Sequence, residues 1–143
     1  MKYRTNYTVY FSERQIVFQA YVFPKIIQMD NRMMKIFEEL PRRHTLKDEQ
    51  SYIKLSDLTI KEFITEYRNV LFDVIHSDEF CSIFPEMRKL RRLELSDMRK
   101  CVFLMVLLGF EIEYISNLLY SNKQSIYTMK SELLKANPNY FKS

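Results

Sequence analysis

Glycine is almost absent from this sequence, which has 1 Gly and 4 Pro among its 143 residues. Tight β-hairpins need residues that accept a positive φ, usually Gly or Asn, so a β-rich fold is disfavoured and an all-α fold is predicted. Gly-rich phosphate loops, both the dinucleotide-binding fingerprint and the P-loop, need several glycines and are excluded. Hydrophobic residues make up 47% of the chain and aromatic residues 15%, which is enough to fill a core.

Cysteine and histidine are also scarce. Cys81 and Cys101 lie in apolar stretches, and His44 and His76 are far apart in the sequence. None of them has a partner at the spacing of metal ligands, so we expect no metal and no cofactor. We interpret the cysteines as buried thiols of a reduced, cytoplasmic protein.

Long apolar segments are missing as well. The strongest apolar run, residues 101–110, is shorter than the ~20 residues that span a bilayer, and no signal-peptide pattern opens the chain. We therefore expect a soluble protein without a membrane partner. The net charge of +4, from 22 basic and 18 acidic residues, permits nucleic acid as a partner without demanding it. No nucleophile–base pair or carboxylate pair stands out, so we predict that the protein is not an enzyme.

Residues 1–76 are predicted to form an N-terminal helical region that mediates dimerisation. Ser12 marks a helix start, and the apolar residues that follow recur with helical spacing up to residue 40. The first of them are Ile16, Val17, Ala20 and Phe23. Pro24 lies inside this segment and predicts a kink or two consecutive helices.

The clearest helical pattern covers residues 58–77. Thr59 and Glu62 have the spacing of a capping box, which predicts that the helix begins at Thr59. Its apolar residues lie three, four and seven positions apart, as expected of a helix with one buried face. We interpret this helix as a packing or dimerisation element.

Residues 77–143 are predicted to form a second, helix-turn-helix region. Near its start lies the densest basic cluster of the chain, four residues within five positions: Arg88, Lys89, Arg91 and Arg92. Two interpretations stay open. The cluster is either the solvated side of a helix whose Met87 and Leu90 point inward, or a contact with phosphate groups of nucleic acid.

The last part of the chain shows three helical patterns in a row. Ser96 and Asn122 are N-cap candidates, and Gly109, the single glycine, stands where a helix C-terminus favours one. The order is therefore a buried helix after Ser96, a glycine turn, a short helix, a tight turn and a final helix after Asn122. A helix-turn-helix preceded by one supporting helix has this order.

Residues 95–136 contain four short motifs: Leu95-Ser96, Gly109-Phe110, the hexapeptide 114–119, and Ser125-Ile126. In this order, and at spacings that need no gap in the correspondence, they resemble the LuxR-type helix-turn-helix, the C-terminal DNA-binding unit of many bacterial transcriptional regulators. The upstream segment EFCSIFP is similar to the corresponding segment in a subgroup of these regulators from gut anaerobes. In that subgroup tetratricopeptide repeats precede the helix-turn-helix, whereas no such repeat is visible in this sequence.

Two departures from that family concern charge. Arg99 stands where the family usually has the Glu that closes a capping box, and Glu132 lies among the few lysines of the last helix. A carboxylate near phosphates weakens DNA binding.

The resemblance implies a DNA-binding transcriptional regulator whose last helix enters the major groove. The residues predicted to contact DNA on this helix are Lys123, Gln124, Tyr127, Thr128, Lys130 and Ser131. Gln124 would pair with an adenine edge, and the lysines and the basic cluster would hold phosphates. Double-stranded DNA and a second copy of the chain are the expected partners. The alternative is a non-enzymatic protein-interaction module on the same scaffold, which the weak positive charge and the 10 tyrosines favour.

Overall fold

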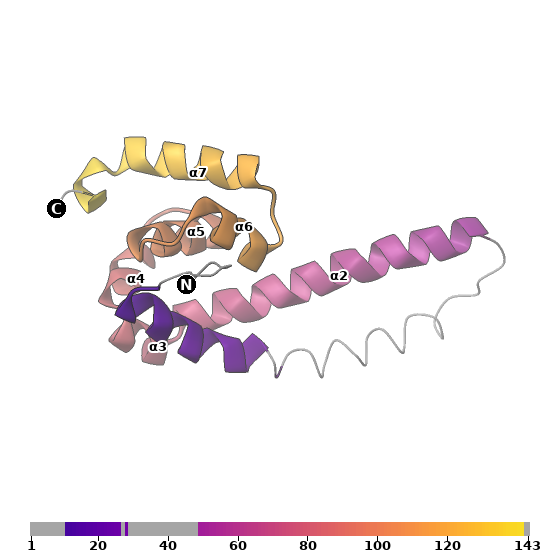
Figure 1. The fold of residues 1–143 in the computed structure, drawn as a ribbon, viewed down its shortest axis with the longest axis horizontal. Helices are drawn as coiled ribbons and strands as arrows, with labels where there is room; N and C mark the ends of the chain where they lie inside the picture. Colours follow the sequence, from indigo (N-terminus) through magenta and orange to yellow (C-terminus); the bar gives the residue numbers. More distant parts are fainter. Residues whose placement is uncertain (1–10, 27, 29–48, 142–143) are drawn as a thin grey trace, which may run out of the picture.

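The computed structural model describes residues 11–26, 28 and 49–141, and every regular element in these residues is a helix (Figure 1). The all-α prediction is therefore confirmed for the described part. An N-terminal helix covers residues 13–26, and the following elements are α2 (Glu49–His76), α3 (Asp78–Ile83), α4 (Pro85–Leu90), α5 (Asp97–Leu107), α6 (Ile112–Leu119), α7 (Lys123–Ala136) and the 3-10 helix η1 (Pro138–Phe141). None of the helices in these ranges combines the length and apolar character needed to span a bilayer.

The N-terminal helix begins as predicted, at Ser12. The Ser12 hydroxyl accepts a hydrogen bond from the Gln15 backbone N–H, and the Gln15 side-chain oxygen accepts one from the Ser12 N–H. This reciprocal pair is a capping box. The helix continues through Pro24, while the predicted kink or second helix falls largely on residues 29–40, which lie outside the described residues.

The residues of this helix that pack inward are not the residues whose spacing predicted the helix. Phe18 and Val22 are buried, whereas Ile16, Val17 and Phe23 are exposed. The helix is apolar on both sides, so spacing alone does not select a buried face. Contacts of Phe18 with other aromatic rings of the core select it.

The predicted start of α2 at Thr59 is wrong, because this helix already begins at Glu49. No Gly or Pro interrupts residues 49–59, so the helix extends through the apparent capping box. The predicted apolar face is confirmed towards the C-terminus, where Tyr67, Leu71 and Ile75 are buried. The N-terminal half of α2 projects beyond the other labelled helices (Figure 1).

One hydrophobic core includes residues from both predicted regions of the chain. Phe18 of the N-terminal helix contacts Phe80, Phe84 and Phe110, with ring centroids 6.1, 6.1 and 5.4 Å away. Residues of α2, α5, α6 and α7 belong to the same cluster of buried side chains. The division of the chain after residue 76 stays a prediction.

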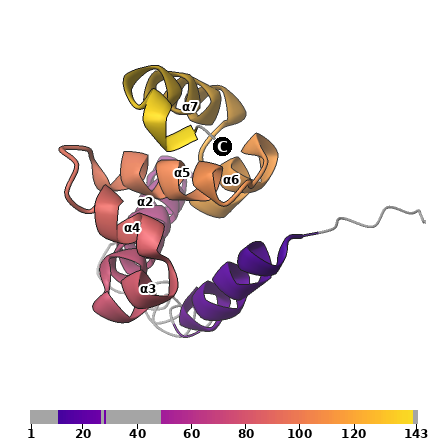
Figure 2. The same ribbon diagram turned by 90° about the vertical axis from the view of Figure 1, so that its left-hand side faces the viewer.

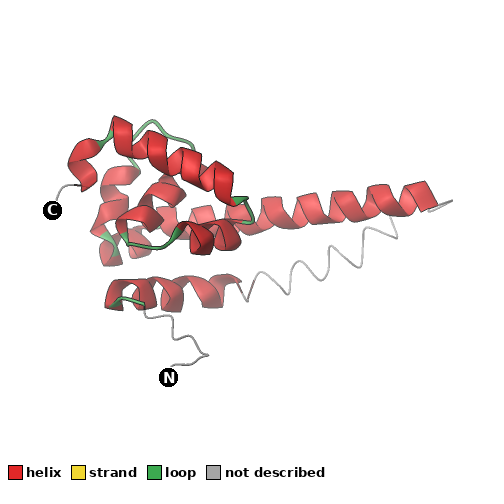
Figure 3. Cartoon of the chain, turned by 45° about the horizontal axis from the view of Figure 1, so that its top comes forward, coloured by secondary structure: helices red, strands yellow, loops and turns green. Residues whose placement is uncertain are grey.

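The helix ends in the C-terminal half follow the local signals in the sequence. Ser96 and Asn122 accept backbone hydrogen bonds as N-caps, as predicted, and Ser77 caps α3 in the same way. Gly109 has φ +86°, and the Phe110 N–H donates to the Met105 carbonyl at 3.0 Å, which closes α5 with a Schellman motif. Helix α5 is the central element, with α7 on one side and α4 on another (Figure 2). Figure 3 shows that loops and turns alone connect the helices of the described part.

Candidate functional site

Helix α7 packs against α5 and α6 along a single stripe. Ile126 and Leu133 are buried, and Met129 lies partly buried against the core. Lys123, Gln124, Tyr127 and Thr128 of the predicted contact set are exposed, while Lys130 and Ser131 are half-buried. The predicted outward face of this helix thus presents polar side chains and one aromatic ring to solvent.

The turn between α6 and α7 contains a strained residue. Tyr120 has φ +53° and ψ +44°, the left-handed conformation that a bulky side chain rarely adopts. The Ser121 N–H donates to the Ser116 carbonyl at 3.0 Å, so the turn closes α6 in the same way as Gly109 closes α5. A tyrosine in this conformation needs compensating contacts.

Helix α2 supplies these contacts. The Tyr120 ring packs edge-on against Tyr67 and Phe63, with centroids 4.9 and 5.5 Å away. Arg68 donates from Nε to the Leu119 carbonyl and from Nη2 to the Tyr120 carbonyl, both at 3.0 Å. The Arg68 guanidinium thereby caps the negative end of α6. Sequence reasoning missed this role, because Arg68 has the spacing of an ordinary solvated residue on α2.

The charges around α7 are partly paired. Glu132, the only carboxylate of α7, forms an ion pair with Arg99 of α5 at 2.8 Å. Lys123 lies 3.7 Å from Glu113 of α6, and both side chains are about two-thirds exposed. Arg99 cannot close a capping box. It instead neutralises Glu132, the carboxylate that lies among the lysines of α7.

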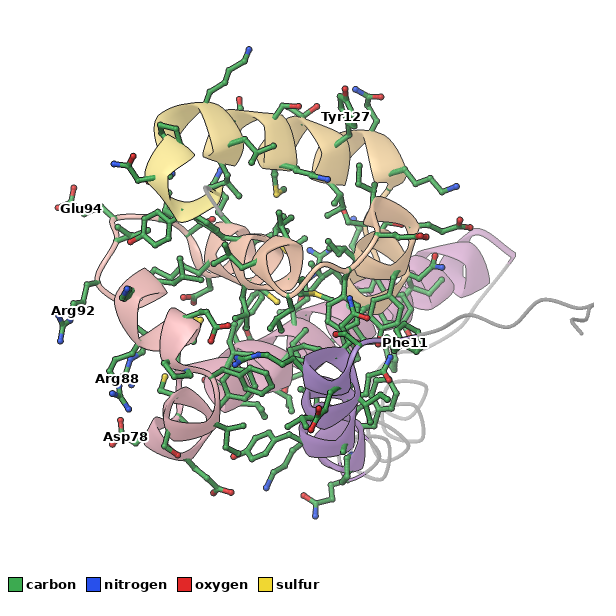
Figure 4. The ribbon with its side chains drawn as sticks, turned by 60° about the vertical axis from the view of Figure 1, so that its left-hand side comes forward. Phe11, Asp78, Arg88, Arg92, Glu94 and Tyr127 are labelled. Atoms are coloured by element: carbon green, nitrogen blue, oxygen red, sulfur yellow. The ribbon has the colours of Figure 1, made fainter. Side chains whose placement is uncertain are left out.

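The basic cluster of α4 and the following turn lies on another side of the molecule. Arg88, Lys89 and Arg92 are exposed, and the inward orientation of Met87 and Leu90 is confirmed. Figure 4 shows Arg88 and Arg92 projecting from the side of the molecule, in line with Asp78 and Glu94 and away from Tyr127. Helix α5 separates α4 from α7 (Figure 2). The structure therefore does not bring the cluster onto the outward face of α7.

Arg91 differs from the rest of this cluster. Its Nη1 donates to the His76 carbonyl at 2.9 Å and pairs with Asp78 at 3.1 Å, while Lys100 donates to the Arg91 carbonyl. Arg91 thus joins the ends of α2, α3 and α4, and its guanidinium is engaged within the protein.

The surface clefts in the described part of the chain include the following two. One, of about 620 Å³, is lined by residues that include Arg14, Glu86, Lys89 and Tyr140, and Arg14 pairs with Glu86 at 2.7 Å. The other, of about 410 Å³, is lined by aromatic rings and carboxylates, among them Phe11, Phe110, Tyr114, Glu111 and Glu113. Neither cleft holds a serine, threonine or cysteine beside a base.

The cysteines are both free and buried. Burial raises the pKa of Cys101 to about 12 and also raises that of Cys81, although the guanidinium of Arg91 lowers the latter in part. Both side chains therefore stay as unreactive thiols near neutral pH. Within the described ranges, no three His, Cys, Asp or Glu residues gather where they would hold a metal ion.

Comparison with known proteins adds no family to these observations. No protein-family model matches the chain, and neither a curated protein nor a solved structure matches it.

Proposed function

We propose that the protein is a DNA-binding transcriptional regulator in which α6, the turn at Tyr120 and α7 act as a LuxR-like helix-turn-helix. The support for this proposal is the order of capped helices from Ser96 to Asn137 together with the sequence motifs at their ends. In this proposal the protein works in the bacterial cytoplasm as a homodimer, so that two copies of α7 read two half-sites.

One observation carries the proposal, namely that α7 has an uncovered polar face with no unpaired carboxylate. Only one stripe of α7 is buried, and its sole acidic residue, Glu132, is paired with Arg99. An exposed helix with amide, hydroxyl and ammonium groups on one face can enter a major groove and donate to base edges and phosphates.

The exposed residues suggest a division of roles along α7. Gln124 would pair with an adenine edge, because its amide both donates and accepts. Lys123 and Lys130 would hold phosphates, and the Glu113 carboxylate at 3.7 Å is exposed enough to release Lys123 to a stronger anion. Arg88, Lys89 and Arg92 would contact DNA only where a duplex bends around the molecule, and Arg91 is left out of the proposed contact set.

A second function has its own support. Tyr127 is 57% exposed in the middle of the outward face, and large exposed aromatic side chains are enriched at protein interfaces. The alternative is therefore a protein-interaction module in which the same face of α7 binds another protein instead of DNA.

A fluorescence-anisotropy titration with labelled double-stranded DNA fragments, at low and moderate salt, tests the proposal. Binding should weaken with salt, and Lys123→Ala and Lys130→Ala should each lower the slope of log K against log salt by about 1. The matched control is Lys61→Ala, an exposed lysine on α2. Absence of binding at low salt, or equal effects of all three variants, refutes the proposal and leaves the interaction module.

A further inference from the structure

The cleft of about 410 Å³ combines aromatic rings with carboxylates and is here called the aromatic–acidic cleft. The rings of Phe11, Phe110 and Tyr114 line it together with Glu111 and Glu113. Within the described part of the chain, no lysine, arginine or histidine lines it. Its volume lies in the range of small-molecule sites, which combine apolar walls with a few polar groups that orient the ligand.

The aromatic rings of this cleft are fixed by contacts with one another and with the N-terminal helix. Phe110 and Tyr114 stack with centroids 4.5 Å apart, and Phe11 meets the Tyr114 ring edge-on at 5.6 Å. Phe11 lies at the start of the N-terminal helix (Figure 4). From the same helix, Gln19 donates to the Tyr114 hydroxyl at 2.9 Å. A ligand would therefore bind rings that are already in place, which lowers the entropy cost of binding.

The two carboxylates are available to a ligand. Glu111 is exposed and is the N-cap residue of α6, but its side chain makes no capping hydrogen bond. It also takes part in none of the ion pairs found among the described residues. Glu113 lies 3.7 Å from Lys123, and because both side chains are about two-thirds exposed, this pair is weak. Both carboxylates can therefore accept hydrogen bonds from a bound molecule.

We propose that the aromatic–acidic cleft binds a small organic cation, namely an amine with an apolar body. Carboxylates accept charge-assisted hydrogen bonds from an ammonium group, and aromatic rings attract cations while they cover apolar groups. Glu111 holds the ammonium group, and Phe11 and Tyr114 contact the apolar body. An anionic ligand would face two carboxylates without a compensating cation among the described lining residues.

The size of the cleft favours a small molecule over a protein. Protein interfaces use roughly 20–30 residues on each side. The described residues that line this cleft number eight, and the three not yet named as lining are the uncharged Gln15, Gly109 and Asn117. The proposal rests on the cleft alone and does not depend on DNA binding by α7.

An NMR titration of the full chain with phenethylammonium chloride, without DNA, tests the proposal. Gly109 lines the cleft and is the single glycine of the chain, so its amide signal is easily assigned. This signal should shift and saturate, with a dissociation constant of about 1–10 mM, as expected for a ligand of this size. Phenethyl alcohol has nearly the same shape without the charge, and it should bind roughly fivefold more weakly.

Two variants test the assigned roles. Glu111→Gln should weaken phenethylammonium binding roughly threefold and leave binding of the alcohol unchanged, because only the cation uses the carboxylate. Glu79→Gln is the matched control, since Glu79 is an exposed carboxylate in the first turn of α3 and does not line the cleft. Phe11→Leu keeps an apolar side chain but removes the ring, so it should weaken binding of the cation more than that of the alcohol. Circular dichroism of the variants checks that they fold.

Each negative result overturns a named part of the proposal. Absence of a saturable shift at Gly109 refutes the site, and equal binding of the alcohol and the ammonium refutes the recognition of charge. Equal effects of Glu111→Gln and Glu79→Gln refute the role of the cleft carboxylate. Tighter binding of a short lysine-rich peptide than of phenethylammonium refutes the small molecule as the occupant.

Discussion

Removing the Arg68 guanidinium should loosen the turn between α6 and α7. Arg68 makes two hydrogen bonds of 3.0 Å to the carbonyls of Leu119 and Tyr120, across 51 and 52 positions of sequence. Hydrogen bonds to charged groups contribute about 1.5–3 kcal/mol each when buried. Here the guanidinium is partly exposed, and the freed carbonyls can bond to water, so we expect Arg68→Ala to cost about 1–2 kcal/mol in total.

Two measurements separate this local role from general destabilisation. Urea denaturation followed by circular dichroism gives the change in the free energy of unfolding. In a thermal scan, the same loss of stability should lower the melting temperature by roughly 2–8 °C. Hydrogen exchange should quicken more at the amides of Tyr120, Ser121 and the first turn of α7 than at those of α5, because the lost contacts lie at this turn.

The control and the refuting result are both defined by the structure. Lys61→Ala removes an exposed cation from the same helix and should change stability by less than about 0.5 kcal/mol. If Arg68→Ala matches that control, and exchange near Tyr120 is unchanged, Arg68 does not hold the turn. If stability falls while exchange rises equally everywhere, Arg68 matters to the fold without positioning α7.

Three further predictions concern local features. Gly109→Ala should cost roughly 1–2 kcal/mol in urea denaturation, because φ is +86° and the new Cβ would lie 3.3 Å from the Gln15 amide nitrogen; a cost near zero would contradict this. Asn122→Ala should cost about 1 kcal/mol by the same assay, because the side chain accepts a 2.8 Å bond from the Ser125 N–H, and Asn122→Asp should retain most of that stability. Burial raises the pKa of Cys101 from its ordinary value of 9.0 to about 12, so between these values the unfolded chain binds fewer protons. The free energy of unfolding should therefore fall above pH 9, by up to about 1.4 kcal/mol per pH unit, and Cys101→Ala should remove this part of the pH dependence.

Local sequence signals predicted the helix ends of the C-terminal half. A cap depends on one side chain and on backbone groups within a few positions of it. Ser96, Asn122 and Gly109 could therefore be assigned from sequence alone. The scarcity of glycine and the apolar spacing likewise predicted an all-α chain with a buried α5. The apparent cap at Thr59 failed because helix propagation from Glu49 passed through it.

The assignment of the faces was decided only by the tertiary structure. The N-terminal helix has apolar residues on two sides, and packing of Phe18 on the core left Ile16 and Phe23 exposed. The Arg99–Glu132 pair and the Arg68 cap join residues far apart in the sequence, so no spacing rule reports them. The same holds for the basic cluster. The sequence shows that four basic residues lie close together, but it does not show in which direction their side chains point. Short-range chemistry determined where the helices begin and end, and long-range packing determined which surfaces remain available for DNA or for a second copy.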